Sequence, residues 1–118
     1  MWLNEGIATV SVDRFLEKQT IRDDTLQFIK DYQPKKKPPS YRELSRMDRE
    51  AIAYHGSRGY WMVRYLEQAI PGFLRDTFAE YTDTETIEAN IAEKLGIEPE
   101  NFWEDIDDIV ADYFMNSK

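Results

Sequence analysis

Apolar side chains recur at intervals of three and four residues along most of the chain, which is the period of amphipathic α-helices. The segments with this period are 4–18, Asp23 or Asp24 to Tyr32, 40–46, 48–69, 73–81, 82–95 (behind a Thr82-Asp83-Thr84 cap) and Pro99 to Phe114. No run of alternating residues is long enough for a sheet. The pattern predicts an all-α protein, an irregular bundle of about five to seven helices in one domain over residues 1–118.

The longest predicted helix, over 48–69, should lie at the centre of this bundle. Its buried stripe is predicted to consist of Ile52, His55, Gly59, Met62 and Leu66. Gly56 and Gly59 each lower helix propensity by about 1 kcal/mol relative to alanine. They indicate either close approach of another backbone or a ligand, or a kink near residue 56.

The first predicted helix carries a carboxylate on an apolar face. This face consists of Glu5, Ala8, Val12, Phe15 and Leu16. A second apolar strip consists of Leu3, Ile7 and Val10, so we expect the helix to be covered on more than one side. The residues leave two interpretations open. Glu5 is either exposed in the first turn, where the helix dipole favours a negative charge, or it is a metal ligand.

Charge is distributed unevenly along the chain, whose net charge is −8. Residues 1–75 carry 13 basic and 10 acidic side chains, and residues 76–118 carry 2 basic and 13 acidic ones. This balance argues against nucleic-acid binding. The lysine run in the proline-rich segment 33–39 is expected to lie in an exposed loop. The acids of the last helix are expected to lie on its solvated outer face; they are Glu100, Glu104, Asp105, Asp107, Asp108 and Asp112.

Composition restricts the chemistry further. The 118 residues are 42% hydrophobic, which is enough for one modest core. The absence of cysteine excludes disulfides, thiolate zinc sites and cysteine nucleophiles. We find neither a membrane span nor a signal segment, and we therefore expect a soluble, cytoplasmic protein with no membrane partner.

The string Trp2-Leu3-Asn4-Glu5-Gly6-Ile7-Ala8 resembles the third-ligand motif of the gluzincin zinc metallopeptidases, the group of aminopeptidase N and leukotriene A4 hydrolase. The resemblance implies that Glu5 binds zinc together with two histidines of a preceding HExxH helix, whose glutamate is the general base. This chain has one histidine, His55, and no HExxH. It therefore resembles the C-terminal helical part of such a peptidase, with residues 1–81 as the gluzincin-like portion and 82–118 as acidic C-terminal helices.

A second segment, Gly59 to Gln68, is similar to the helix that follows the third ligand in this family. The family's Tyr-x-x-Gly pattern supplies a tyrosine that stabilises the oxyanion. Aligning the glycine with Gly59 places Gly56 at the tyrosine position, so the sequence departs from the pattern. Either Tyr54 or His55 then supplies the donor, or this function is absent from the chain. Ordinary core packing is the alternative interpretation for both residues.

Two functions follow. In the first, the chain is part of a zinc-dependent peptidase, contributes the third zinc ligand and is inactive alone. Zinc and a peptide substrate would then bind only to the intact parent, and this chain alone should bind zinc no more tightly than roughly millimolar. In the second, the chain is a non-catalytic helical interaction module. An uncovered first helix would favour a homo-oligomer.

Overall fold

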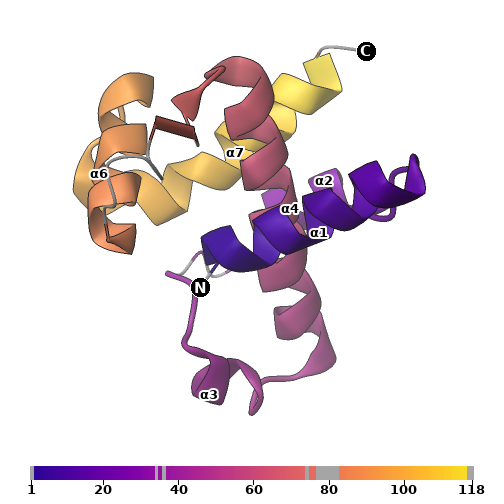
Figure 1. Ribbon diagram of the computed structural model, residues 1–118. Coiled ribbons are helices and arrows are strands. Elements are labelled where there is room, and N and C mark those ends of the chain that lie inside the picture. Colours follow the sequence, from indigo (N-terminus) through magenta and orange to yellow (C-terminus); the bar gives the residue numbers. More distant parts are fainter. Residues whose placement is uncertain (1, 34, 36, 74, 77–82, 117–118) are drawn as a thin grey trace.

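The computed structural model describes residues 2–33, 35, 37–73, 75–76 and 83–116 (Figure 1). The helices are α1 (Trp2–Leu16), α2 (Thr25–Asp31), α3 (Tyr41–Leu44), α4 (Arg49–Ala69), α6 (Thr84–Leu95), the 3₁₀ turn η1 (Pro99–Asn101) and α7 (Phe102–Asn116). The described residues form helices, turns and loops but no strand, so the all-α prediction is confirmed. Within them, no helix combines the length and apolar character that crossing a membrane requires.

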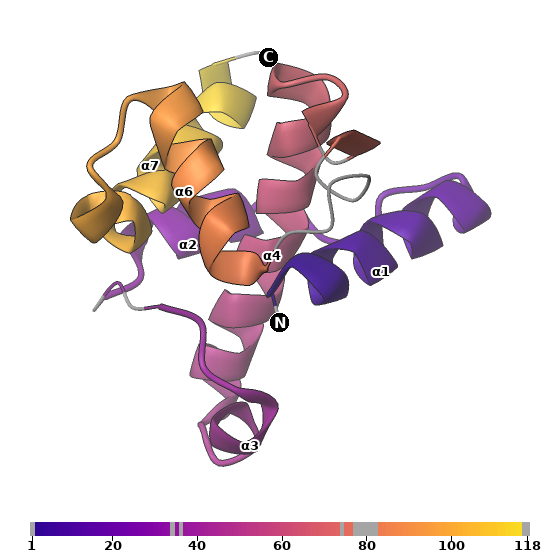
Figure 2. The same cartoon turned by 60° about the vertical axis from the view of Figure 1, so that its left-hand side comes forward.

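Helix α4 runs through the middle of the molecule. Helix α1 packs against one side of it, and α2 and α7 pack against the other (Figure 2). Every residue from Ser57 to Val63 is buried, because neighbours surround this part of α4 on all sides. Trp61 is fully buried, and its Nε1 donates a hydrogen bond to Thr25 Oγ1 at 2.7 Å. The predicted central helix is therefore confirmed.

Short polar side chains begin two of the helices, as the sequence predicted. The Asp48 carboxylate accepts a hydrogen bond from the Ala51 N–H, and the Asp83 carboxylate accepts one from the Thr86 N–H, both at 2.8 Å. Gly96 ends α6 with a left-handed φ of 71°. The helix predicted over 73–81 lies largely outside the described residues.

Helix α1 ends two residues before its predicted boundary. Glu17 has a φ of 55°, and its N–H donates to the carbonyl oxygen of Arg14 at 3.3 Å. The N–H of Lys18 donates to the carbonyl oxygen of Asp13 at 3.1 Å. These two bonds form a helix-ending arrangement that usually has glycine at the position of Glu17. Because no glycine is present, the sequence did not indicate this helix end.

Two predictions about buried apolar faces were wrong. The exposed fractions of Val12, Phe15 and Leu16 are 48%, 87% and 46%, because the described residues cover α1 only on the side that faces α4. We call these three residues the open strip of α1. Ile52, predicted to be buried, is 41% exposed, because the first turns of α4 extend beyond the other long helices (Figure 1).

Candidate functional site

Helix α1 crosses α4 at two glycines, Gly6 and Gly59. A Cβ atom on Gly6 would lie 2.3 Å from the Gly59 carbonyl oxygen and 2.6 Å from Cγ2 of Val63. A Cβ atom on Gly59 would lie 3.0 Å from the carbonyl oxygen of Trp2. The backbones therefore approach this closely only because side chains are absent. The expected close backbone approach is confirmed at Gly59, whereas α4 continues unbroken through Gly56.

Two more residues of the Trp2–Ala8 motif hold α1 against the core. Leu3 is fully buried. The Trp2 indole is 5% exposed, its Nε1 donates to Glu88 Oε1 at 3.0 Å, and its ring meets Trp103 edge-on at 6.0 Å between centroids. Burial raises the pKa of Glu88, although the bond from Trp2 opposes this effect. Glu5, by contrast, is exposed, so the motif divides into packed residues and an accessible carboxylate.

Glu5 borders a pocket of about 150 Å³ between the first halves of α1 and α4. We call it the Glu5 pocket. It is lined by Trp2, Glu5, Pro38, Pro39, Leu44, Ile52, His55 and Gly56. The structure therefore brings the predicted metal ligand Glu5 and the predicted catalytic residue His55 to one pocket, although they lie on different helices.

His55 combines an accessible position with a restricted imidazole. It is partly exposed, but its Nδ1 atom is buried and has no hydrogen-bond partner in the described structure. Burial lowers the pKa of His55, and the positive charge of Arg58 lowers it further. The imidazole is therefore neutral at pH 7 and carries a single N–H group.

Tyr54, the other predicted catalytic residue, lies outside the Glu5 pocket. It is fully buried, and its hydroxyl donates a hydrogen bond to Asp107 Oδ2 and accepts one from Arg58 Nη2. Burial is the main reason that the pKa of Tyr54 is strongly raised. The hydroxyl is therefore occupied by structural partners.

Arg58 and Asp107 form a salt bridge in which neither side chain is exposed. Arg58 Nε lies 2.9 Å from Asp107 Oδ1, and Arg58 Nη2 lies 3.0 Å from Oδ2. The guanidinium also lies over the rings of Tyr54 and Trp103, at 4.5 and 4.9 Å from their centroids. This bidentate, stacked arrangement compensates for the cost of burying both charges.

Lys35 adds a second cation to this group. Its Nζ lies 3.3 Å from Asp107 Oδ2 and donates to carbonyl oxygens of residues 29 and 30 at the end of α2, where the helix dipole favours a cation. The predicted exposure of the lysine run was therefore wrong for Lys35, whose side chain is 7% exposed. These contacts anchor the loop whose Pro38 and Pro39 line the Glu5 pocket. We call Lys35, Tyr54, Arg58 and Asp107 the ionic cluster.

The sequence contained a signal for the ionic cluster that was missed. Asp107 falls on the apolar period of Trp103, Val110 and Phe114. Arg58 falls on that of Tyr54, Trp61 and Tyr65. One charge of each sign at a core position on two helices is typical of a buried ion pair. The predicted solvation of the C-terminal acids is confirmed for Glu100, Glu104, Asp105, Asp108 and Asp112 and wrong for Asp107.

The donor atoms at the Glu5 pocket do not complete a zinc site. A catalytic zinc requires three protein ligands besides water. Glu5 and His55 supply two side chains of suitable chemistry, and the described residues contain no group of three or more metal-ligating side chains. Any zinc bound to Glu5 must therefore receive further ligands from outside the described part of the chain.

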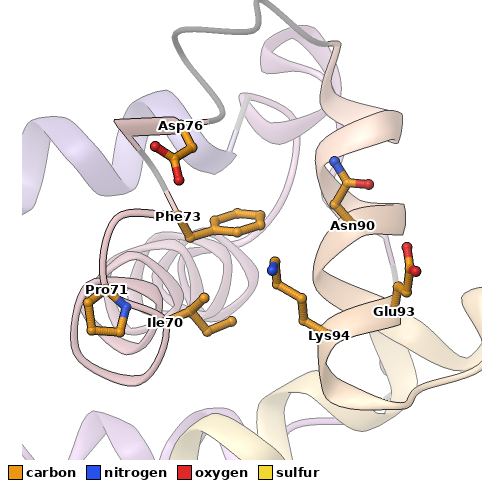
Figure 3. Close-up of a pocket in the computed structure, with 7 residues that line it drawn as sticks. All are labelled: Ile70, Pro71, Phe73, Asp76, Asn90, Glu93 and Lys94. Carbon is orange, nitrogen blue, oxygen red and sulfur yellow. The ribbon is translucent and has the colours of Figure 1, made fainter.

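A second depression, of about 530 Å³, lies between the end of α4 and α6 (Figure 3). It is lined by Ile70, Pro71, Phe73, Asp76, Asn90, Glu93 and Lys94. Phe73 and Lys94 point into the space between the two helices (Figure 3). Its charged side chains are exposed to solvent, and none of the predicted site residues lies here.

Comparisons with protein-family profiles, curated proteins and solved structures returned no match for this chain. The residues at the Glu5 pocket and the motif that contains Glu5 are therefore the basis for a functional proposal.

Proposed function

We propose that this chain supplies the carboxylate ligand of a zinc-dependent peptidase site and is inactive alone. The observation that carries the proposal is the position of Glu5 within its motif. Trp2, Leu3 and Gly6 are packed against the core, whereas Glu5 is exposed at the rim of a pocket. A rigid helix that presents one accessible carboxylate is what a metal ligand requires.

The remaining zinc ligands and the general base would come from a segment outside these 118 residues. The open strip of α1 supports this part of the proposal. Val12, Phe15 and Leu16 continue the helical face of Glu5 and expose apolar surface on which a further helix can pack. When bound to Glu5 and to ligands from that segment, zinc would polarise a peptide carbonyl and activate a water molecule.

His55 is the better of the two candidates for stabilising an oxyanion. Its imidazole lines the Glu5 pocket and is neutral at pH 7, so it can donate one N–H. The Tyr54 hydroxyl is held by Asp107 and Arg58 and lies elsewhere. In an active zinc-loaded protein, His55→Phe should lower kcat by about 10²-fold or more without loss of zinc, whereas a role in packing alone would leave kcat unchanged.

Metal binding tests the proposal directly. Calorimetry on the 118-residue chain should detect zinc binding no tighter than about millimolar, because two donors do not close a site. In the complete protein, Glu5→Gln should abolish zinc retention. Glu17→Gln, at an exposed carboxylate just beyond the C-terminal end of α1, should not. Stoichiometric micromolar binding by the isolated chain, or unchanged zinc in the Glu5→Gln protein, would contradict the proposal. Sequencing the DNA upstream of codon 1 should reveal an in-frame HExxH.

The open strip favours a second candidate, a non-catalytic interaction module that pairs with another copy of itself. Phe15 is 87% exposed, and such apolar patches mark contact surfaces. The chain would then elute above its 14.0 kDa mass, and Phe15→Asp would restore a monomer by light scattering. A monomer at all concentrations would exclude this candidate and leave the peptidase proposal intact.

A further inference from the structure

The apolar walls of the Glu5 pocket limit what can enter it. Five of the lining residues are apolar in side chain, namely Trp2, Pro38, Pro39, Leu44 and Ile52. The volume of about 150 Å³ equals that of a cavity known to hold one benzene molecule in another protein. A charged group placed against these walls would lose hydration without a partner. The pocket is therefore sized for one apolar group.

The walls are also held in place. The Trp2 indole is fixed by its hydrogen bond to Glu88 and its edge contact with Trp103. The proline rings of Pro38 and Pro39 restrict their backbone. Lys35, three residues before Pro38, contacts the end of α2 and Asp107 of α7. Where a wall is fixed in this way, binding loses less conformational entropy.

The helix surface at Gly56 contributes free space. A Cβ atom at this position would meet no atom within 4 Å. Packing therefore does not require glycine at position 56, whereas it does at position 59. Gly56 lines the Glu5 pocket, so its missing side chain leaves open space there.

We infer that the Glu5 pocket binds one phenylalanine- or leucine-sized side chain of a peptide substrate and holds the adjoining peptide group beside Glu5 and His55. The inference deepens the proposed function: that the bound peptide is a substrate rests on the proposed peptidase activity. It names a class of peptide, those with a medium-sized apolar residue next to the reacting bond. Glycine would leave the pocket empty, lysine would place a charge in it, and tryptophan would exceed its volume.

Titration of the 118-residue chain with neutral single-residue probes tests the inference. N-acetyl-phenylalanine amide and N-acetyl-leucine amide should shift the Trp2 indole N–H resonance with dissociation constants on the order of 1 mM. N-acetyl-glycine amide should bind at least about tenfold more weakly, because it lacks the buried side chain. Equal shifts with all three probes would overturn the inference.

Two variants locate the binding. Ile52→Ser should raise the dissociation constant of the phenylalanine probe about fivefold. The matched control, Val12→Ser, changes a residue of the open strip that is 48% exposed, against 41% for Ile52, and should have no effect. Gly56→Leu should block the probe by filling the pocket while the helical circular dichroism is preserved. Unchanged binding in Ile52→Ser and Gly56→Leu would overturn the inference.

The outcomes separate this inference from the proposed function. Probe binding needs no metal, and zinc retention by the complete protein needs no probe. Selective probe binding without Glu5-dependent zinc retention would keep the side-chain pocket and remove the peptidase proposal. Glu5-dependent zinc retention without selective binding would do the reverse.

Discussion

Tyr54 and His55 are adjacent in the sequence, yet they belong to two regions of opposite character. Tyr54 lies in the ionic cluster, where Arg58 and Asp107 are fully buried and paired with each other. His55 lies at the Glu5 pocket, where its Nδ1 has no partner among the described residues. One step along α4 therefore separates a buried, paired group of charges from a partly exposed imidazole.

This difference shows that a perturbed pKa need not mark a reactive site. The strong rise in the pKa of Tyr54 comes mainly from burial, and its hydroxyl is closed off by Asp107 and Arg58. Perturbed groups often indicate function, but buried ion-pair networks produce the same signature. Accessibility distinguishes the two regions here, and for this reason our proposal concerns Glu5 and His55 rather than Tyr54.

The largest expected effect is loss of the anion in the ionic cluster. Asp107→Asn leaves Arg58 and Lys35 buried without a counter-charge, so the free energy of unfolding should fall by about 3–5 kcal/mol. Urea denaturation measures the change. Asp108→Asn alters the next, exposed residue and should stay within about 0.5 kcal/mol. If the two variants were equally stable, the cluster would not be the structural region that we describe.

The next effect concerns the helix crossing that places Glu5 beside His55. Gly6→Ala introduces a Cβ atom 2.3 Å from a backbone oxygen, so α1 must shift, at a cost of about 1–3 kcal/mol. The matched variant Gly56→Ala meets no atom within 4 Å and should stabilise α4 by up to about 1 kcal/mol. Changes of opposite sign in the free energy of unfolding, measured by urea denaturation, would support the close contact of α1 with α4 at Gly6. Equal changes would contradict it.

The sequence predicted features that depend on local chemistry. Asp48, Asp83 and Gly96 mark helix ends because the capping interaction involves only neighbouring residues. It also gave Gly56 and Gly59 as possible points of backbone approach, and the structure confirms this only at Gly59. Such signals require no knowledge of which helices meet.

Features that depend on distant partners were predicted poorly. The burial of Lys35 depends on Asp107, which is on another helix, so the loop sequence alone suggested exposure. The apolar period of α1 could not show that the strip with Phe15 has no cover among the described residues. At the candidate site, Glu5 and His55 could each be named, but their shared pocket depends on the crossing of α1 and α4.

A smaller, pH-dependent effect should arise at His55. Its pKa is lowered from 6.5, mainly by burial and then by Arg58, so the unfolded chain binds more protons in the window below 6.5. Stability from this residue is therefore complete above that pH and is lost as pH falls through the window. Relative to His55→Gln, the natural protein should lose more stability between about pH 7.5 and about pH 5 in urea denaturation. Identical pH dependence would mean that the partial burial of His55 does not lower its pKa.

The smallest expected effect on stability is at Glu5 itself. Glu5→Ala removes an exposed carboxylate from the first turn of α1 and should cost no more than about 0.5 kcal/mol. Glu88→Ala removes the acceptor of the Trp2 indole and should cost about 1 kcal/mol or more. If Glu5→Ala lowered the free energy of unfolding by more than about 2 kcal/mol, Glu5 would have a structural role. A loss within about 0.5 kcal/mol would instead fit the exposed position of Glu5 and the metal-ligand role that we propose for it.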